Sequence, residues 1–166
     1  MTKAKPATAA RDRASHMRMW ITAGLGLTAD LLTKSWAWRT LDGDFTERLD
    51  VIEGVLDIRL ALNAGVAFGI ELGWWPIVLT VLAGIALVIY LFLTSLKTAV
   101  CAHFGLGLIL SGAMGNLADR LTHPYQVRDF INFSFWPTFN VADVALCVGV
   151  GLLALSMLRA PQPSNK

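Results

Sequence analysis

The sequence predicts an all-α polytopic membrane protein with four transmembrane helices and a small extramembrane β-sheet. Of its 166 residues, 55% are hydrophobic and only 16% are charged, and the mean hydropathy is +0.55. A soluble domain usually carries about a quarter charged residues. Four apolar runs also approach the roughly 20 residues that a helix needs to cross a bilayer. The apolar excess therefore lies in segments of membrane-spanning length.

The first expected span, residues 19–38, follows a basic cytoplasmic tail, residues 1–18. The tail holds five Lys or Arg residues against one acid, Asp12, and this excess is typical of a cytoplasmic segment. Its Ala, Lys, Thr and Pro content predicts disorder. The span contains Asp30 and Lys34 and lacks a clear small-x-small cleavage site. We therefore interpret it as a retained anchor and not as a secretory signal.

The other three spans are expected at residues 75–95, 98–118 and 141–158. Four spans return both termini, including a short tail at residues 161–166, to the cytoplasmic side. Lys97, in the link between the second and third spans, agrees with this orientation. Residues 19–160 are then a single membrane-embedded domain.

Two stretches on the outer side connect these spans. Residues 39–73 hold seven acids against three arginines, and their apolar and polar residues partly alternate between glycines. This pattern predicts short strands in a small sheet. Residues 119–140 form the second outer loop, with a further short strand expected over residues 127–133.

Similar phrases with the pattern Asn-x-x-Asp stand at the mouths of the last two spans. They are GNLADR, residues 115–120, and FNVADVALC, residues 139–147. A helix N-cap at Asn140 with Asp143 in the first turn explains the second phrase. The first phrase closes a helix, where Asp119 is unfavourable unless a cation compensates for it. The repeated pattern therefore points to more than capping.

Asp30 and Lys34 lie one turn apart on one face of the first span. A charged side chain at mid-membrane costs on the order of 3 kcal/mol. A mutual ion pair would lower that cost. Alternatively, the two residues hold the functional site, and the residues alone leave both interpretations open.

The expected topology brings three acids, Asp119, Asp129 and Asp143, together near the outer membrane surface. Two close carboxylates share a proton, so that one can act as base on a water while the other acts as acid. The sequence offers no Ser-His-Asp set or phosphate-binding Gly loop. This predicts aspartyl-type hydrolysis. A channel, a transporter or an assembly factor with structural acids is the alternative on these grounds.

Other classes of site are not indicated. The three histidines, His16, His103 and His123, are scattered and do not have the spacing of zinc ligands. The basic tail lacks the aromatic interleaving of a nucleic-acid-binding segment. We therefore expect neither a metal nor a nucleic-acid partner.

Five motifs, in order, resemble those of the bacterial lipoprotein signal peptidases, the signal peptidase II family. Any one of them is weak, but the ordered set within a four-span chain is specific, and the resemblance covers roughly residues 19–158. The motifs are DLLTK (residues 30–34), NAGVAF (63–68), SGAMGNLADR (111–120), VRDF (127–130) and FNVAD (139–143).

The resemblance implies an aspartyl endopeptidase of the bacterial inner membrane, with its active site near the periplasmic face. It would cleave diacylglyceryl-modified prolipoproteins before the lipid-modified cysteine. The catalytic pair would be Asp129 and Asp143, and which is base and which is acid stays open because a coupled pair titrates as a unit. Further residues match positions that shape the site or bind substrate: Asp30, Lys34, Asn63, Gly65, Gly112, Asn116, Asp119, Arg120 and Asn140.

The resemblance also implies no metal or organic cofactor. The expected partners are prolipoprotein substrates, membrane lipids and globomycin-type peptide inhibitors, and a monomer is expected. The sheet of residues 39–73 would be a periplasmic cradle over the substrate. Among the departures from the family's pattern, Ser111 replaces a glycine and Val144 stands where Ser or Thr is frequent. Arg128 replaces an apolar residue, and this predicts a cation near the pair that biases its protonation.

Overall fold

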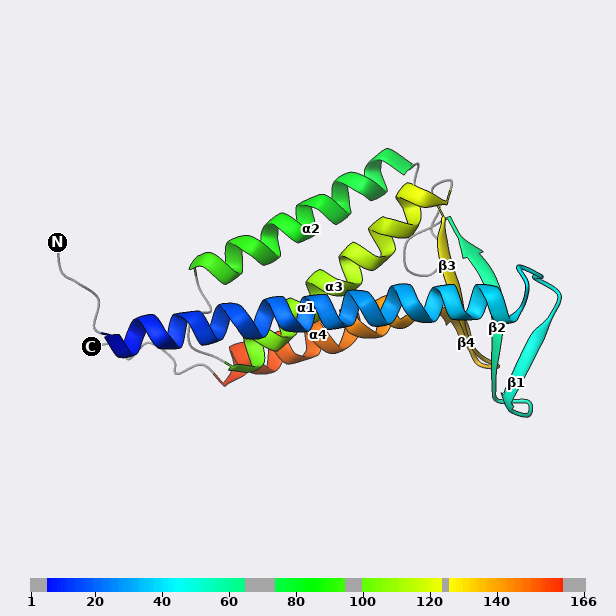
Figure 1. Cartoon of the computed structure of the whole chain (residues 1–166), viewed down its shortest axis with the longest axis horizontal. Coiled ribbons are helices and arrows are strands. Elements are labelled where there is room, and N and C mark those ends of the chain that lie inside the picture. Colours follow the sequence, from blue (N-terminus) through cyan, green and yellow to red (C-terminus); the bar gives the residue numbers. More distant parts are fainter. Residues whose placement is uncertain (1–5, 65–73, 95–99, 124–125, 160–166) are drawn as a thin grey trace.

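Four helices lie side by side, and a four-stranded sheet covers one end of them (Figure 1). This computed structural model describes residues 6–64, 74–94, 100–123 and 126–159. The chain order is α1 (Pro6–Thr40), β1 (Arg48–Ile52), β2 (Leu56–Asn63), α2 (Trp74–Thr94), α3 (Val100–Thr122), β3 (Val127–Phe133), β4 (Trp136–Phe139) and α4 (Val141–Leu158).

Two of the expected helices have other limits in the structure. The prediction of a disordered tail was wrong for residues 6–18, since α1 begins at Pro6. Proline is favoured at a first helical position, and the alanines that follow have the highest helix propensity. The third expected helix was placed at residues 98–118, but α3 continues to Thr122. Asp119 and Arg120 therefore lie inside a helix and not in the outer loop.

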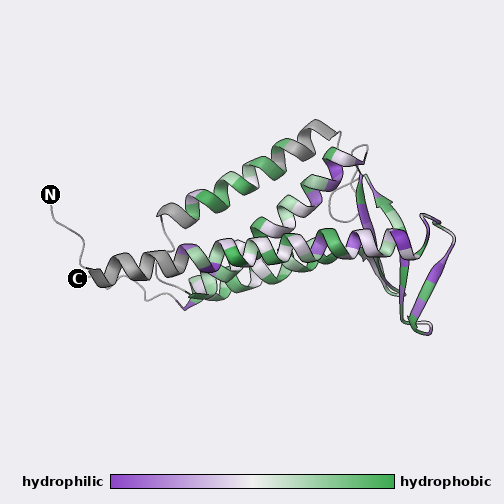
Figure 2. Ribbon diagram, in the orientation of Figure 1, coloured by the Kyte–Doolittle hydropathy of each residue, from purple (hydrophilic) through white to green (hydrophobic). Residues whose placement is uncertain are grey.

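The helices differ in how well they fit a membrane by length and composition. Among the described residues, α3 and α4 are long and apolar enough to cross one, and α2 holds a shorter apolar segment, Val81–Leu91. Hydrophobic residues dominate the middle of the helices, and hydrophilic residues gather where α1 and α3 meet the sheet (Figure 2). The polar end of the bundle is thus the end that carries the sheet.

Glycines let α3 pack closely against α4. A Cβ on Gly105 would lie 2.8 Å from the Gly149 carbonyl oxygen, and one on Gly149 would lie 2.7 Å from the Gly105 oxygen. A Cβ on Gly112 would overlap the Ala142 carbonyl oxygen. Neighbouring backbones can come this close only where no side chain separates them. Because α3 also packs against α1 and α2, it is the central helix of the bundle.

The sheet is antiparallel in the order β1-β2-β3-β4. β1, β2 and β3 confirm the expected strands, while β4 was not predicted. Ile58 and Leu60 of β2 and Phe130 of β3 pack with Ala37 and Leu41 at the end of α1. Because side chains alternate along a strand, Asp129 points away from the face that Phe130 buries. The core under the sheet therefore aims Asp129 at the start of α4.

Candidate active site: two carboxylates joined by asparagines

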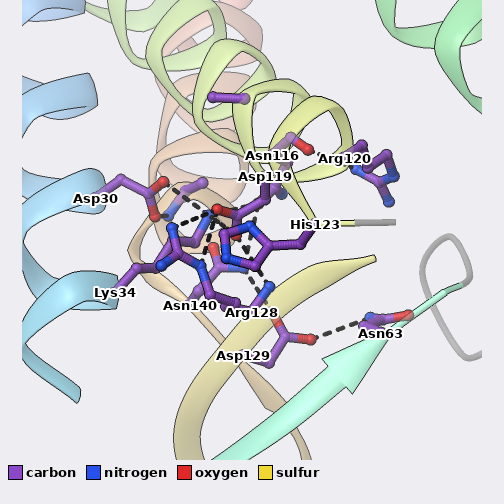
Figure 3. A network of polar contacts seen from close by, with 12 residues as sticks. Asp30, Lys34, Asn63, Asn116, Asp119, Arg120, His123, Arg128, Asp129 and Asn140 are labelled. Carbon is purple, nitrogen blue, oxygen red and sulfur yellow. Dashed lines mark hydrogen bonds and ion pairs between the residues drawn. The ribbon is translucent and has the colours of Figure 1, made fainter. Parts of the chain in front are cut away.

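Four segments meet at the polar end of the bundle (Figure 3). They are the second half of α1, the last turns of α3, the start of β3 and the N-terminus of α4. The predicted polar site residues lie in these segments, with Asn63 at the end of β2. Asp30, Lys34, Asp119 and Asn140 are fully buried, and Asn116 and Asp129 are nearly so. Buried polar groups at this density must satisfy one another.

Asn140 is the N-cap of α4, as predicted. Its Oδ1 accepts a hydrogen bond from the backbone N–H of Asp143 at 3.1 Å, and the Asp143 carboxylate accepts one from the Asn140 N–H at 3.1 Å. This reciprocal capping box satisfies two N–H groups that the first turn of a helix leaves unpaired. The Nδ2 group of Asn140 takes no part in the cap and donates two hydrogen bonds within the site. It donates to Asp129 Oδ1 at 2.6 Å and to Asn116 Oδ1 at 3.1 Å.

Asn116, on α3, connects the cap to the second carboxylate. Its Oδ1 accepts from Lys34 Nζ at 3.1 Å as well as from Asn140, and its Nδ2 donates to Asp143 Oδ1 at 2.8 Å. An ammonium can only donate, so Lys34 fixes which end of the Asn116 amide is the oxygen. Two asparagines therefore join Asp129 to Asp143 without adding charge.

Asp129 is the more strongly perturbed acid. Its two oxygens accept from Asn140 and, at 3.1 Å, from Asn63 Nδ2. Burial, followed by the negative charge of Asp143, raises the pKa of Asp129 to about 7, against hydrogen bonds from Asn63 and Asn140 that lower it. A carboxyl group with such a pKa exchanges a proton near neutral pH.

Lys34 is the cation at the centre of the buried network. Its Nζ lies 2.8 Å from Asp30 Oδ2 and 3.2 Å from Asp119 Oδ2. Asp30 in turn accepts from the backbone N–H of Ala142 at 2.9 Å, which ties α1 to the start of α4. The two interpretations of Asp30 and Lys34 therefore both apply, since they form an ion pair and also hold the site.

Asp119 does not join the carboxylate pair. It is bound by Arg128, which donates from its backbone N–H at 2.9 Å, from Nε at 3.1 Å and from Nη2 at 2.7 Å. The sequence predicted that Arg128 would place its cation near Asp129. The structure corrects this, because alternation along β3 directs the Arg128 side chain to Asp119 instead. Nothing in the sequence pattern relates residues 119 and 128, because only the fold brings them together.

The remaining predicted residues have diverse positions. Arg120 donates through Nη1 to the Asn116 backbone oxygen at 3.1 Å. Gly112 is a packing position between α3 and α4, and Gly65 lies outside the described residues. Sequence reasoning missed Gly115, where a Cβ would overlap the Asp30 carboxylate. Its signal was present in the third motif, which is rich in small residues.

The described part of the chain contains no group of three or more His, Cys, Asp or Glu side chains placed to hold a metal ion. The buried acids meet amides and cations instead. With one proton between Asp129 and Asp143, the arrangement can take a proton from a water and supply one to a leaving group. It is suited to hydrolysis by a carboxylate pair.

Known proteins resemble the chain over most of its length. The family model described as "Signal peptidase (SPase) II" matches residues 22–159. A lipoprotein signal peptidase of Shouchella clausii is 38% identical over 84% of this chain and 91% of its own. One of Neisseria gonorrhoeae is 32% identical over 92% of this chain and 96% of its own. A solved structure described as a bacterial membrane enzyme is 26% identical, with a TM-score of 0.77 over 86% of this chain and 94% of that one.

Proposed function

The chain belongs to the signal peptidase II family and cleaves signal peptides from prolipoproteins; on this premise we propose that it is an aspartic endopeptidase whose catalytic pair is Asp129 and Asp143. The observation that carries the proposal is that one residue, Asn140, holds both carboxylates, Asp129 through its side chain and Asp143 through its backbone N–H. It donates to the Asp129 carboxylate at 2.6 Å and exchanges capping hydrogen bonds with Asp143. A residue that served only as the N-cap of α4 would not also bond a carboxylate on β3.

In the proposed reaction, Asp129 carries the proton and Asp143 is the base. The pKa of about 7 supports a proton on Asp129 at neutral pH. Asp143 takes a proton from a water, whose oxygen attacks the carbonyl carbon of the scissile peptide. Asp129 protonates the carbonyl oxygen, which gives a tetrahedral intermediate. When the C–N bond of this intermediate breaks, Asp143 gives the proton it took up to the leaving amine of the lipid-modified cysteine, and one hydroxyl of the intermediate returns a proton to Asp129. The products are a carboxylic acid and an amine, as the addition of one water requires.

The remaining residues support this pair. Asn63, Asn116 and Asn140 donate to the two carboxylates, and donors that are already oriented need no rearrangement during the reaction. Lys34, which pairs with Asp30, fixes the Asn116 amide. The segment of the sheet around Asn63 would lie over the substrate. No cofactor takes part in this scheme.

We further propose that α1, α2, α3 and α4 are four spans of the bacterial inner membrane. The apolar lengths of α3 and α4 support this, as does the polar site at the sheet end of the bundle. The basic residues before and after the helices favour cytoplasmic termini, which places the site near the periplasmic face. There it would meet the cysteine of a diacylglyceryl-modified prolipoprotein beside the lipid. Globomycin-type peptides would compete for this site, and the enzyme would act as a monomer.

The test is a gel-shift assay with a purified prolipoprotein, with and without its diacylglyceryl group, in detergent micelles. We compare wild type with Asp129→Asn and Asp143→Asn. Asp50→Asn is the matched control, because it makes the same change at an exposed acid of β1.

Cleavage of only the lipidated substrate, by wild type and Asp50→Asn, supports the proposal. Undiminished cleavage by Asp129→Asn or Asp143→Asn removes that residue from the pair. Cleavage of the unlipidated substrate at an equal rate contradicts the proposed dependence on diacylglycerol.

A further inference from the structure

Arg128 and Asp119 form an ion pair that the proposed reaction does not use. The Arg128 side chain is 13% exposed and that of Asp119 only 1%. Both Asp119 oxygens accept from Arg128, one from the backbone N–H and the other from Nε and Nη2. Such a forked contact fixes both planar groups more firmly than a point charge does. Arg128 therefore holds Asp119 in one orientation.

Lys34 divides its three N–H donors among three partners. They are Asp30 at 2.8 Å, Asn116 Oδ1 at 3.1 Å and Asp119 at 3.2 Å. The ammonium has no further donor to give. Its contact with Asp119 is the longest of the three, and Asp119 is the carboxylate that Arg128 already binds. The cations Lys34 and Arg128 thus balance the buried acids Asp30 and Asp119, and this leaves one Lys34 donor for Asn116.

Removal of the Arg128 guanidinium would leave Asp119 with a buried charge and Lys34 as its main partner. An uncompensated buried charge is costly, so the ammonium would move toward Asp119 and away from Asn116. The Asn116 amide would then lose the contact that fixes its oxygen end. Its Nδ2 donates to Asp143 at 2.8 Å, so the disturbance would reach the catalytic pair.

We propose that Arg128 is a positioning residue for the hydrolytic pair, acting through Asp119, Lys34 and Asn116. The inference rests on the proposed function, since it assigns a role toward Asp143 as a catalytic group. Arg128 touches neither Asp129 nor Asp143 through a hydrogen bond among the described contacts. Its effect falls on the rate of the chemical step and leaves substrate binding alone.

The test is steady-state cleavage of the lipidated prolipoprotein in micelles by Arg128→Met and Arg128→Lys. Arg48→Met is the matched control, because Arg48 pairs with Asp50 on the exposed strand β1, away from the site. Arg128→Met is expected to lower kcat about tenfold, the effect of one weakened hydrogen bond at the pair, with KM within about twofold of wild type. Arg128→Lys keeps the charge but loses the fork, so an intermediate kcat is expected. Arg48→Met keeps the wild-type kcat.

Each outcome decides between the alternatives. An unchanged kcat in Arg128→Met overturns the inference, and so does a rise in KM alone, which would make Arg128 a substrate contact. If Arg128→Met does not fold, as shown by its thermal unfolding, the Lys variant decides alone, and a kcat equal to wild type contradicts the positioning role. A wild type that cleaves nothing refutes the proposed function, which is a separate failure.

Discussion

Replacement of Asn140 by Ala tests whether one buried side chain both begins α4 and holds the Asp129 carboxylate. Loss of an N-cap side chain costs about 1 kcal/mol. The 2.6 Å bond to Asp129 is a bond to an ionisable group, worth about 1.5–3 kcal/mol, and the bond to Asn116 adds about 1 kcal/mol. We expect the variant to lose roughly 3.5–5 kcal/mol of its free energy of unfolding. That is a large share of the stability of an ordinary domain.

Asn140→Asp separates the two roles. Aspartate caps a helix about as well as asparagine, so about 1 kcal/mol of the loss is regained. A carboxylate cannot donate, however, and it would face Asp129 at the same short distance. Its stability should therefore fall further as the pH rises, while both variants lose cleavage. If Asn140 acted only as the N-cap of α4, Asn140→Asp would be close to wild type in stability and in cleavage.

The assays are thermal unfolding in detergent micelles and gel-shift cleavage of the lipidated prolipoprotein. Asn132→Ala is the control, because Asn132 makes the same kind of bond, to Asp57 at 3.0 Å, away from the site. It should lose about 1–2 kcal/mol of stability and keep its activity. If Asn140→Ala unfolds within about 1 kcal/mol of wild type and cleaves at the wild-type rate, then the role assigned to Asn140 is refuted.

Further predictions concern titration and packing. Because the pKa of Asp129 is raised to about 7, the folded chain keeps a proton on this residue between about pH 4 and 7, where the unfolded chain has lost it. The free energy of unfolding of the wild type therefore falls as the pH rises through that window. Asp129→Asn removes this penalty, so at pH 8 its free energy of unfolding should be on the order of 2 to 4 kcal/mol higher than that of wild type. An unfolding midpoint equal to or lower than that of wild type would contradict the buried-acid account. The pH profile of kcat should have one limb near pH 7, and a flat profile from pH 5 to 8 would count against a shared proton. Gly149→Leu should separate α3 from α4 at a cost of about 1–3 kcal/mol or more, whereas Gly24→Leu, where an added Cβ would meet nothing within 4 Å, should unfold like wild type.

Much of the fold could be predicted because its signals are local. The apolar run of α4 begins directly after an N-cap, and its limits, residues 141–158, match the prediction. The limits of α3 were wrong because an acid near a helix C-terminus indicates its end, while the compensating Arg128 lies nine residues further on. β4 was missed because a four-residue strand containing Pro137 carries little strand signal.

The sequence predicted which residues form the site better than it predicted the hydrogen bonds between them. The repeated Asn-x-x-Asp pattern and the family motifs identified the buried residues. That the Asn140 amide donates to Asn116 depends on how closely α3 packs on α4, which glycines at residues 105, 112 and 149 permit. No periodic pattern or residue spacing in the sequence indicates a contact of this kind between two helices. The partner of Arg128 was missed for the same reason.

The capping box at the start of α4 has a consequence for how the enzyme is made. The ribosome delivers the chain from its N-terminus, so α1 reaches the membrane with Asp30 and Lys34 long before Asn116, Asn140 and Asp143 exist. Until α4 is made, the site has Asp129 but neither Asp143 nor the Asn140 side chain that bonds Asp129. In the proposed mechanism, proteolysis therefore begins only after α4 is in place. A chain that stops before residue 143 would contain the sheet and the first three helices but would lack the proposed base, so it could not carry out the proposed reaction.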